Sequence, residues 1–132
     1  MKTLFAAMTF MMSVSAFANT HLICQTGDIA DMDIKIESTE NDKEKISVIL
    51  TGMDGVTSRT FVNSGFANNS ATQGLKDGKI QAIVSKSDLN IVFGGAFLEA
   101  GVLELNANPT TKKYDVIFAA EGNVYTAACS EK

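Results

Sequence analysis

The 132-residue sequence has no tryptophan, one histidine, one proline and two cysteines, and each scarcity excludes a class of site. One histidine cannot form a histidine-rich zinc site, and any Ser-His-Asp or Cys-His nucleophile would depend on His21. A short chain without tryptophan is a poor candidate for the deep cleft of a glycosidase. Neither a phosphate-binding glycine loop nor a Cys-x-x-Cys redox motif occurs. We therefore expect a protein that is not an enzyme and that carries no cofactor.

Positive charge and long apolar runs are also scarce. The formal net charge is −4, which disfavours binding to nucleic acid and to anionic membrane surfaces. After residue 18, no segment approaches the roughly 20 apolar residues that a membrane-spanning helix needs. We therefore expect no nucleic-acid partner and no membrane-spanning segment.

The first 18 residues have the organisation of a secretory signal peptide. Lys2 makes the start positive, residues 4–14 are mostly apolar, and Ala16-Phe17-Ala18 is an A-x-A cleavage pattern. Cleavage after Ala18 leaves residues 19–132 as one all-β domain, since this length suits a single core. The short charged start is typical of bacterial export, so the expected location is the periplasm or the medium.

Cys24 and Cys129 allow only one intramolecular disulfide, and an exported chain meets an oxidising environment in which it would form. The bridge would enclose nearly the whole domain. Bridged Cα atoms lie about 5–6 Å apart. The first and last segments of the fold are therefore expected to be close neighbours.

Alternation of apolar and polar residues dominates residues 19–132 and predicts half-buried strands. The run Asp33-Ile34-Lys35-Ile36-Glu37 is the clearest case, and Asp77-Gly78 and Glu121-Gly122 are turn signals. Short connections favour pairing of consecutive strands in an antiparallel meander of eight to ten strands. The expected strands are 20–26, 32–38, 44–52, 57–63, 71–75, 79–86, 90–98, 101–107, 112–119 and 123–130.

Two points of the architecture stay open. A disulfide between the first and last strands either closes a small barrel or stacks the ends of a β-sandwich, and we favour the closed or nearly closed barrel. Residues 96–105 also fit a short helix, but Gly94, Gly95 and Gly101 argue against a long one and favour two strands with a turn near Glu99-Ala100-Gly101.

The longest irregular stretch, residues 63–78, is the candidate binding loop, because long loops on a rigid scaffold often carry binding. Phe66 could anchor in a partner or fold back to cap one end of the barrel. The candidate residues of this loop are Asn63, Ser64, Phe66, Asn68, Asn69 and Leu75.

The outline of a small β-barrel with a disulfide between its terminal strands is similar to that of the periplasmic lysozyme inhibitors. Ser64-Gly65-Phe66 resembles their Ser-Gly loop, and no other motif of theirs is matched residue by residue.

Asp28, Asp31 and Asp33 form a weak calcium candidate, since hard cations bind several carboxylate oxygens. Lys35 stands where an EF-hand loop has its third ligand, and no glycine follows it. A solvated acidic segment is the favoured interpretation.

Three functions remain compatible with the sequence. The favoured hypothesis is a monomeric exported domain that binds another protein, for example as an inhibitor of an envelope or extracellular enzyme. The alternatives are a barrel that holds a small apolar ligand and a structural component of the envelope. The expected inward residues are large enough to fill a small barrel, which weakens the ligand hypothesis; they include Ile46, Leu50, Leu103, Leu105, Tyr114 and Phe118.

Overall fold

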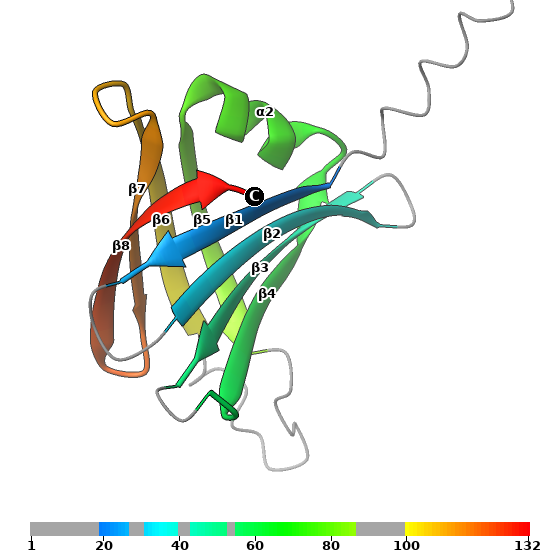
Figure 1. Cartoon of the computed structure of the whole chain (residues 1–132). Coiled ribbons are helices and arrows are strands. Elements are labelled where there is room, and N and C mark those ends of the chain that lie inside the picture. Colours follow the sequence, from blue (N-terminus) through cyan, green and yellow to red (C-terminus); the bar gives the residue numbers. More distant parts are fainter. Residues whose placement is uncertain (1–18, 27–30, 40–42, 53–54, 87–99) are drawn as a thin grey trace, which may run out of the picture.

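The computed structural model describes residues 19–26, 31–39, 43–52, 55–86 and 100–132. The predicted signal peptide, Asp28 and the predicted strand 90–98 lie outside these residues. The described part is a β-barrel with one helix (Figure 1). Its elements are β1 (Thr20–Gln25), β2 (Asp31–Thr39), β3 (Lys43–Thr51), β4 (Ser58–Ala67), α2 (Ser70–Asp77), β5 (Lys79–Lys86), β6 (Ala100–Asn108), β7 (Lys113–Ala120) and β8 (Asn123–Glu131).

The eight strands follow one another around the barrel in sequence order, and β8 pairs with β1 to close it. All neighbouring pairs are antiparallel, as the meander prediction requires. The barrel prediction is confirmed, and the sandwich alternative is wrong. The β7–β8 turn is the predicted one, with positive φ at Glu121 and Gly122.

The disulfide prediction is also confirmed. Cys24 and Cys129 are cross-strand partners in β1 and β8, with Cα atoms 4.0 Å apart. Both side chains are buried within the hydrophobic core. The bridge therefore fastens the first strand to the last from inside the barrel. A disulfide-bonded small domain is consistent with an oxidising compartment.

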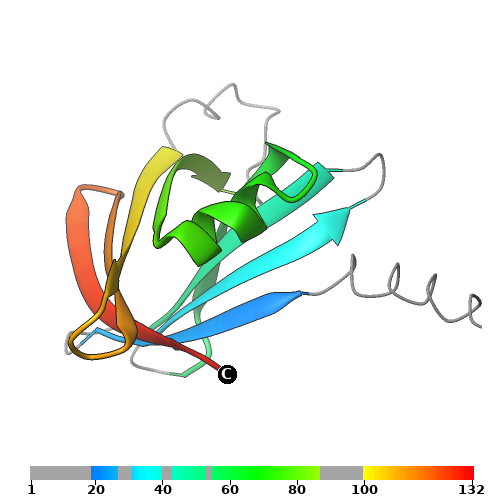
Figure 2. The same ribbon diagram turned by 90° about the horizontal axis from the view of Figure 1, so that it is seen from above.

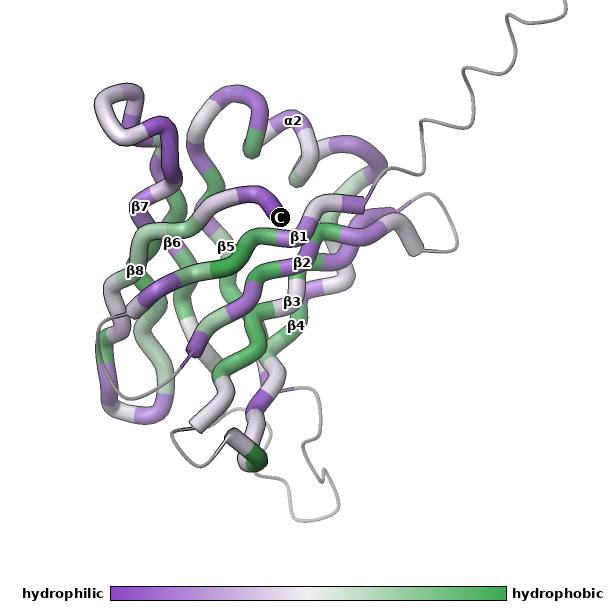
Figure 3. Tube along the Cα trace, in the orientation of Figure 1, coloured by the Kyte–Doolittle hydropathy of each residue, from purple (hydrophilic) through white to green (hydrophobic). Residues whose placement is uncertain are grey.

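Alternation along the strands divides inner from outer residues, and hydrophobic residues concentrate along the strands (Figure 3). In β2, Ile34 and Ile36 are fully buried, while Lys35 between them is partly exposed. Phe61 and Phe118 meet edge to face in the interior with ring centroids 5.1 Å apart. Phe118 also stacks with Tyr125 at 6.4 Å. Aromatic rings from β4, β7 and β8 thus pack against one another in the interior.

The prediction of a turn near Gly101 is wrong. Residues 100–108 form the continuous strand β6, so Ala100 and Gly101 do not form the expected turn. The glycine has a packing role, because a Cβ atom there would lie 2.8 Å from a ring carbon of Phe118. Its small size makes room for the central aromatic ring, rather than for a reversal of the chain.

Residues 63–78 are not a loop, and 71–75 are not a strand. β4 continues to Ala67, and α2 follows almost at once, lying across one end of the barrel (Figures 1 and 2). Asp77-Gly78, expected as a tight turn between strands, ends this helix instead: Gly78 has φ 87° and its N–H donates to the carbonyl of Leu75.

The sequence did not predict α2, because the N-terminal cap of this helix comes from a distant strand. Asn69 occupies the cap position with no side-chain cap of its own. Glu44 of β3 supplies it: Oε1 accepts hydrogen bonds from the N–H groups of Ala71 (2.7 Å) and Thr72 (3.1 Å), and Oε2 accepts one from the Thr72 hydroxyl. Glu44 is only 2% exposed, so this carboxylate is satisfied by the helix N-terminus rather than by water.

Candidate functional site

The seam between β4 and β5 is the weakest contact between neighbouring strands in the described barrel. The two strands pair only at Phe61–Lys86 and Val62–Ser85 and then diverge towards α2. Beyond these pairs, a side chain replaces the backbone ladder. Asn63 Nδ2 donates to the carbonyl of Ile83 at 2.8 Å, while Asn63 Oδ1 accepts from the N–H of Gly65 at 2.8 Å.

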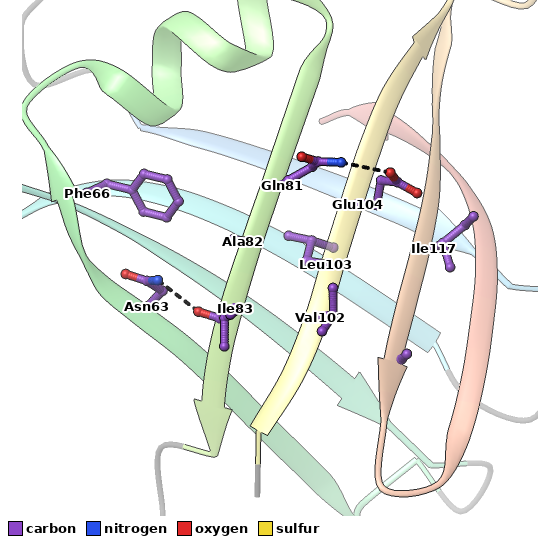
Figure 4. Close-up of a pocket in the computed structure, with 10 residues that line it drawn as sticks. Asn63, Phe66, Gln81, Ala82, Ile83, Val102, Leu103, Glu104 and Ile117 are labelled. Atoms are coloured by element: carbon purple, nitrogen blue, oxygen red, sulfur yellow. Dashed lines mark hydrogen bonds between the residues drawn. The ribbon is translucent and has the colours of Figure 1, made fainter. Parts of the chain in front are cut away.

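A groove of about 590 Å³ lies beside this seam on the outside of the barrel (Figure 4). Phe66 and Asn63 of β4 form one wall. Outward side chains of β5, β6 and β7 provide most of the remaining surface: Gln81, Ile83, Val102, Glu104, Ile117 and Ala119. Its volume falls within the range of ligand-binding clefts, and its lining is mostly apolar with a few polar groups.

The register of the strands joins the groove to a wider apolar surface. Ile83 lies opposite Val102, Val102 opposite Ala119, and Ala119 opposite Val124, one residue from each of β5, β6, β7 and β8. Ile117 lies in the next row of β7. We call Ile83, Val102, Ile117, Ala119 and Val124 the aliphatic face. Ile83 and Val124 are 66% and 64% exposed, so large apolar side chains point into solvent.

One carboxylate lies within this apolar surface. Glu104 of β6 has Gln81 of β5 and Ile117 of β7 as its direct cross-strand partners. Gln81 Nε2 donates to Glu104 Oε2 at 3.0 Å, which orients the side chain (Figure 4). Among the described residues, no lysine or arginine nitrogen comes within 4.0 Å of this carboxylate.

The residues of the predicted binding loop are divided by the structure. Asn63 and Phe66 line the groove, whereas Ser64, Asn68 and Asn69 are exposed and do not line it. Leu75 is a buried residue of α2 and belongs to the core. Phe66 is half-buried and packs against the core, so it fills the diverging seam and also presents surface to the groove.

The acidic residues of β2 do not assemble a metal site in the described residues. Asp33 Oδ2 lies 3.0 Å from His21 Nε2 on the neighbouring strand. Asp31 is exposed. No group of three histidine, cysteine or acidic side chains suited to a metal occurs in the part of the chain that the structure describes.

The aliphatic face was not predicted, although the sequence carries a signal for it. Ile83 stands between the inward residues Ala82 and Val84, and Ile117 stands between Val116 and Phe118. A half-buried strand of an antiparallel barrel should have polar residues at such outward positions. Strands with apolar residues on both faces therefore indicate an exposed apolar surface. Only the register of the barrel shows that these outward positions lie side by side.

Comparisons with protein-family models, curated proteins and solved structures find no match for the chain. The class of protein is thus described by its fold and its site alone. It is a closed eight-stranded antiparallel barrel, covered at one end by a helix, with an apolar groove on its outer wall. In the described residues, no helix has the length and apolar character to span a bilayer.

Proposed function

We propose that this protein is an exported binding module that recognises another protein through the aliphatic face. The observation that carries the proposal is the row Ile83, Val102, Ala119 and Val124 across four neighbouring strands, with Ile117 beside it. The largest contiguous apolar patch on a monomeric soluble protein is often an interaction site.

The width of the face supports a macromolecular partner over a small ligand. Four adjacent strands span three inter-strand steps, or roughly 14 Å at about 4.8 Å per step. Only one side of this row is hollowed into the groove beside Phe66, and Val124 extends the apolar surface beyond it. The interior offers less support for a bound ligand, because the buried rings of Phe61, Phe118 and Tyr125 pack together there.

The closed sheet gives no support to a structural role by strand addition. That mode needs an open sheet edge. Every described strand has a neighbour on both sides, and β1 pairs with β8. The exception along the strands is the seam where β4 and β5 diverge beyond Val62 and Ser85, and there the Asn63 side chain already occupies the carbonyl of Ile83. A side-chain interface remains the better supported mode, and it is the mode that an inhibitor of an envelope or extracellular enzyme would use.

Native mass spectrometry on protein purified from its own compartment tests the proposal. We expect a second polypeptide at fixed stoichiometry with the wild-type chain, lost in Ile117→Asp and retained in Ile23→Asp. The two isoleucines are matched, since each is 43% exposed on a strand, but Ile23 of β1 lies outside the aliphatic face. A wild-type chain without a second polypeptide, or equal retention by both variants, would contradict the proposal.

A further inference from the structure

We propose that the groove receives a basic side chain of the partner, bound at Glu104, next to an apolar side chain that packs on the aliphatic face. This inference rests on the proposed function and specifies the chemistry of the partner: an extended segment in which a lysine or arginine adjoins a large apolar residue.

Glu104 has the placement that such recognition needs. Its carboxylate projects from the outer wall between Gln81 and Ile117, and Val102 precedes it by two residues on the same face of β6. Gln81 engages Oε2, which leaves Oε1 to accept a hydrogen bond from a ligand. A charge already held by a neighbouring amide loses less conformational entropy when a partner binds.

The surroundings favour a cation with an apolar stem. Lysine and arginine can lay their methylene groups along apolar surface while the charged head reaches a carboxylate. Ile117 and Val102 provide that apolar surface beside Glu104, and Phe66 stands at the opposite wall of the groove (Figure 4). An acidic side chain in the same position would meet an unneutralised carboxylate, so the site would discriminate by charge.

The charge of the whole chain acts in the same direction. Its formal net charge of −4 favours encounter with a basic partner and disfavours an anionic membrane surface. Two acidic groups of β2 differ from Glu104 in having a basic side chain beside them. Asp33 lies near His21, and Glu37 lies 3.7 Å from Lys45. Glu104 is therefore the carboxylate of the apolar groove that remains available to a cation from a partner.

A methyl NMR titration tests the inference on the disulfide-bonded protein. The probes are two acetylated, amidated pentapeptides, Gly-Lys-Leu-Phe-Gly and Gly-Glu-Leu-Phe-Gly. We expect the lysine peptide to shift the methyl signals of Ile83, Val102 and Ile117 with an affinity roughly five-fold higher than that of the glutamate peptide. The Glu104→Gln variant should lose this preference.

Asp115→Asn is the matched control. Asp115 of β7 also accepts a hydrogen bond from an amide, that of Asn108 at 3.0 Å, and it lies outside the groove beside Phe66. This variant should keep the preference for lysine. Equal binding of both peptides to the wild-type protein, or a preference that survives in Glu104→Gln, overturns the inference and leaves the proposed function standing. Absence of methyl shifts with either peptide also overturns the inference. The proposed function is tested separately, by whether Ile117→Asp loses the second polypeptide in native mass spectrometry.

Discussion

The two halves of the barrel, β1–β4 and β5–β8, are alike inside and different outside. Both contribute buried aliphatic and aromatic side chains to one core. On the outer wall, β2 carries Asp33, Lys35 and Glu37, whereas β5 and β6 carry Ile83 and Val102 at outward positions. Packing dictates the inner residues, but nothing in the fold requires isoleucine or valine in solvent. The difference therefore separates residues that build the barrel from residues available for binding.

Electrostatics follow the same division. Two carboxylates of β2 have cationic or ionisable partners on adjacent strands, Asp33 with His21 and Glu37 with Lys45. In the β5–β8 half, Glu104 has an amide partner, Gln81, and no cation within 4.0 Å among the described residues. Glu104 therefore differs from Asp33 and Glu37 in having no basic side chain beside it among the described residues.

The largest expected effect concerns the link that joins the halves at β1 and β8. Replacing both cysteines, Cys24→Ala with Cys129→Ala, should lower the free energy of unfolding by about 4 kcal/mol, because the bridge restricts a long loop in the unfolded chain. Urea denaturation measures the change. A loss below about 1 kcal/mol would show that strand pairing alone closes the barrel.

The second prediction compares two glutamates of the β1–β4 half, one inside and one outside. Glu44→Ala should cost about 3 kcal/mol, because it leaves the N-terminal N–H groups of α2 without their acceptor. Glu37→Ala should cost less than about 0.5 kcal/mol, since its pair with Lys45 is partly exposed. Urea denaturation of both variants checks this, and equal losses would contradict the capping role of Glu44.

The third prediction tests whether the aliphatic face is dispensable for folding. Val84→Thr places a hydroxyl in the core and should cost about 2 kcal/mol. Val102→Thr makes the same chemical change at a side chain that is 54% exposed, and it should change stability by less than about 0.5 kcal/mol. Thermal unfolding of the pair measures the difference. A large loss of stability in Val102→Thr would show that the aliphatic face is needed for folding.

The fourth prediction concerns the seam between the halves at β4 and β5. Asn63→Ala removes the hydrogen bond to the Ile83 carbonyl and should lower stability by about 1 kcal/mol. Hydrogen exchange should accelerate in β4 and β5 near the seam and stay unchanged in β1 and β8. Uniform acceleration throughout the barrel would show that Asn63 does not act locally.

The smallest expected effect is a pH dependence in the β5–β8 half. Burial, and secondarily the negative charge of Glu131, raise the pKa of Tyr114 above its ordinary value of 10.0. The unfolded chain therefore ionises at lower pH than the folded one, so stability should hold below pH 10 and fall as the pH rises through the folded-state pKa. Absorbance titration of Tyr125→Phe follows Tyr114 alone, since the chain has two tyrosines. The Tyr114→Phe variant should lose part of the alkaline destabilisation.

The sequence was informative where structure depends on neighbours along the chain. Alternation predicted segments for the eight described strands, and the single possible pairing of Cys24 with Cys129 predicted that the first and last strands are neighbours. α2 could not be recognised, because its cap, Glu44, lies on β3 and Gly74 lowers its intrinsic helix propensity. Of the predicted binding residues, Asn63 and Phe66 line the groove, and the remaining groove residues are brought together only by the register of β5, β6 and β7.

The central claim is that the partner binds the outer wall of the β5–β8 half. The most direct measurement introduces a photoreactive amino acid at position 102 of β6 or at position 35 of β2 and irradiates the protein in its own compartment. We expect one defined cross-linked polypeptide from position 102, absent when Ile117→Asp is added, and none from position 35. The same adduct from both positions, or an adduct from position 35 alone, would contradict the claim.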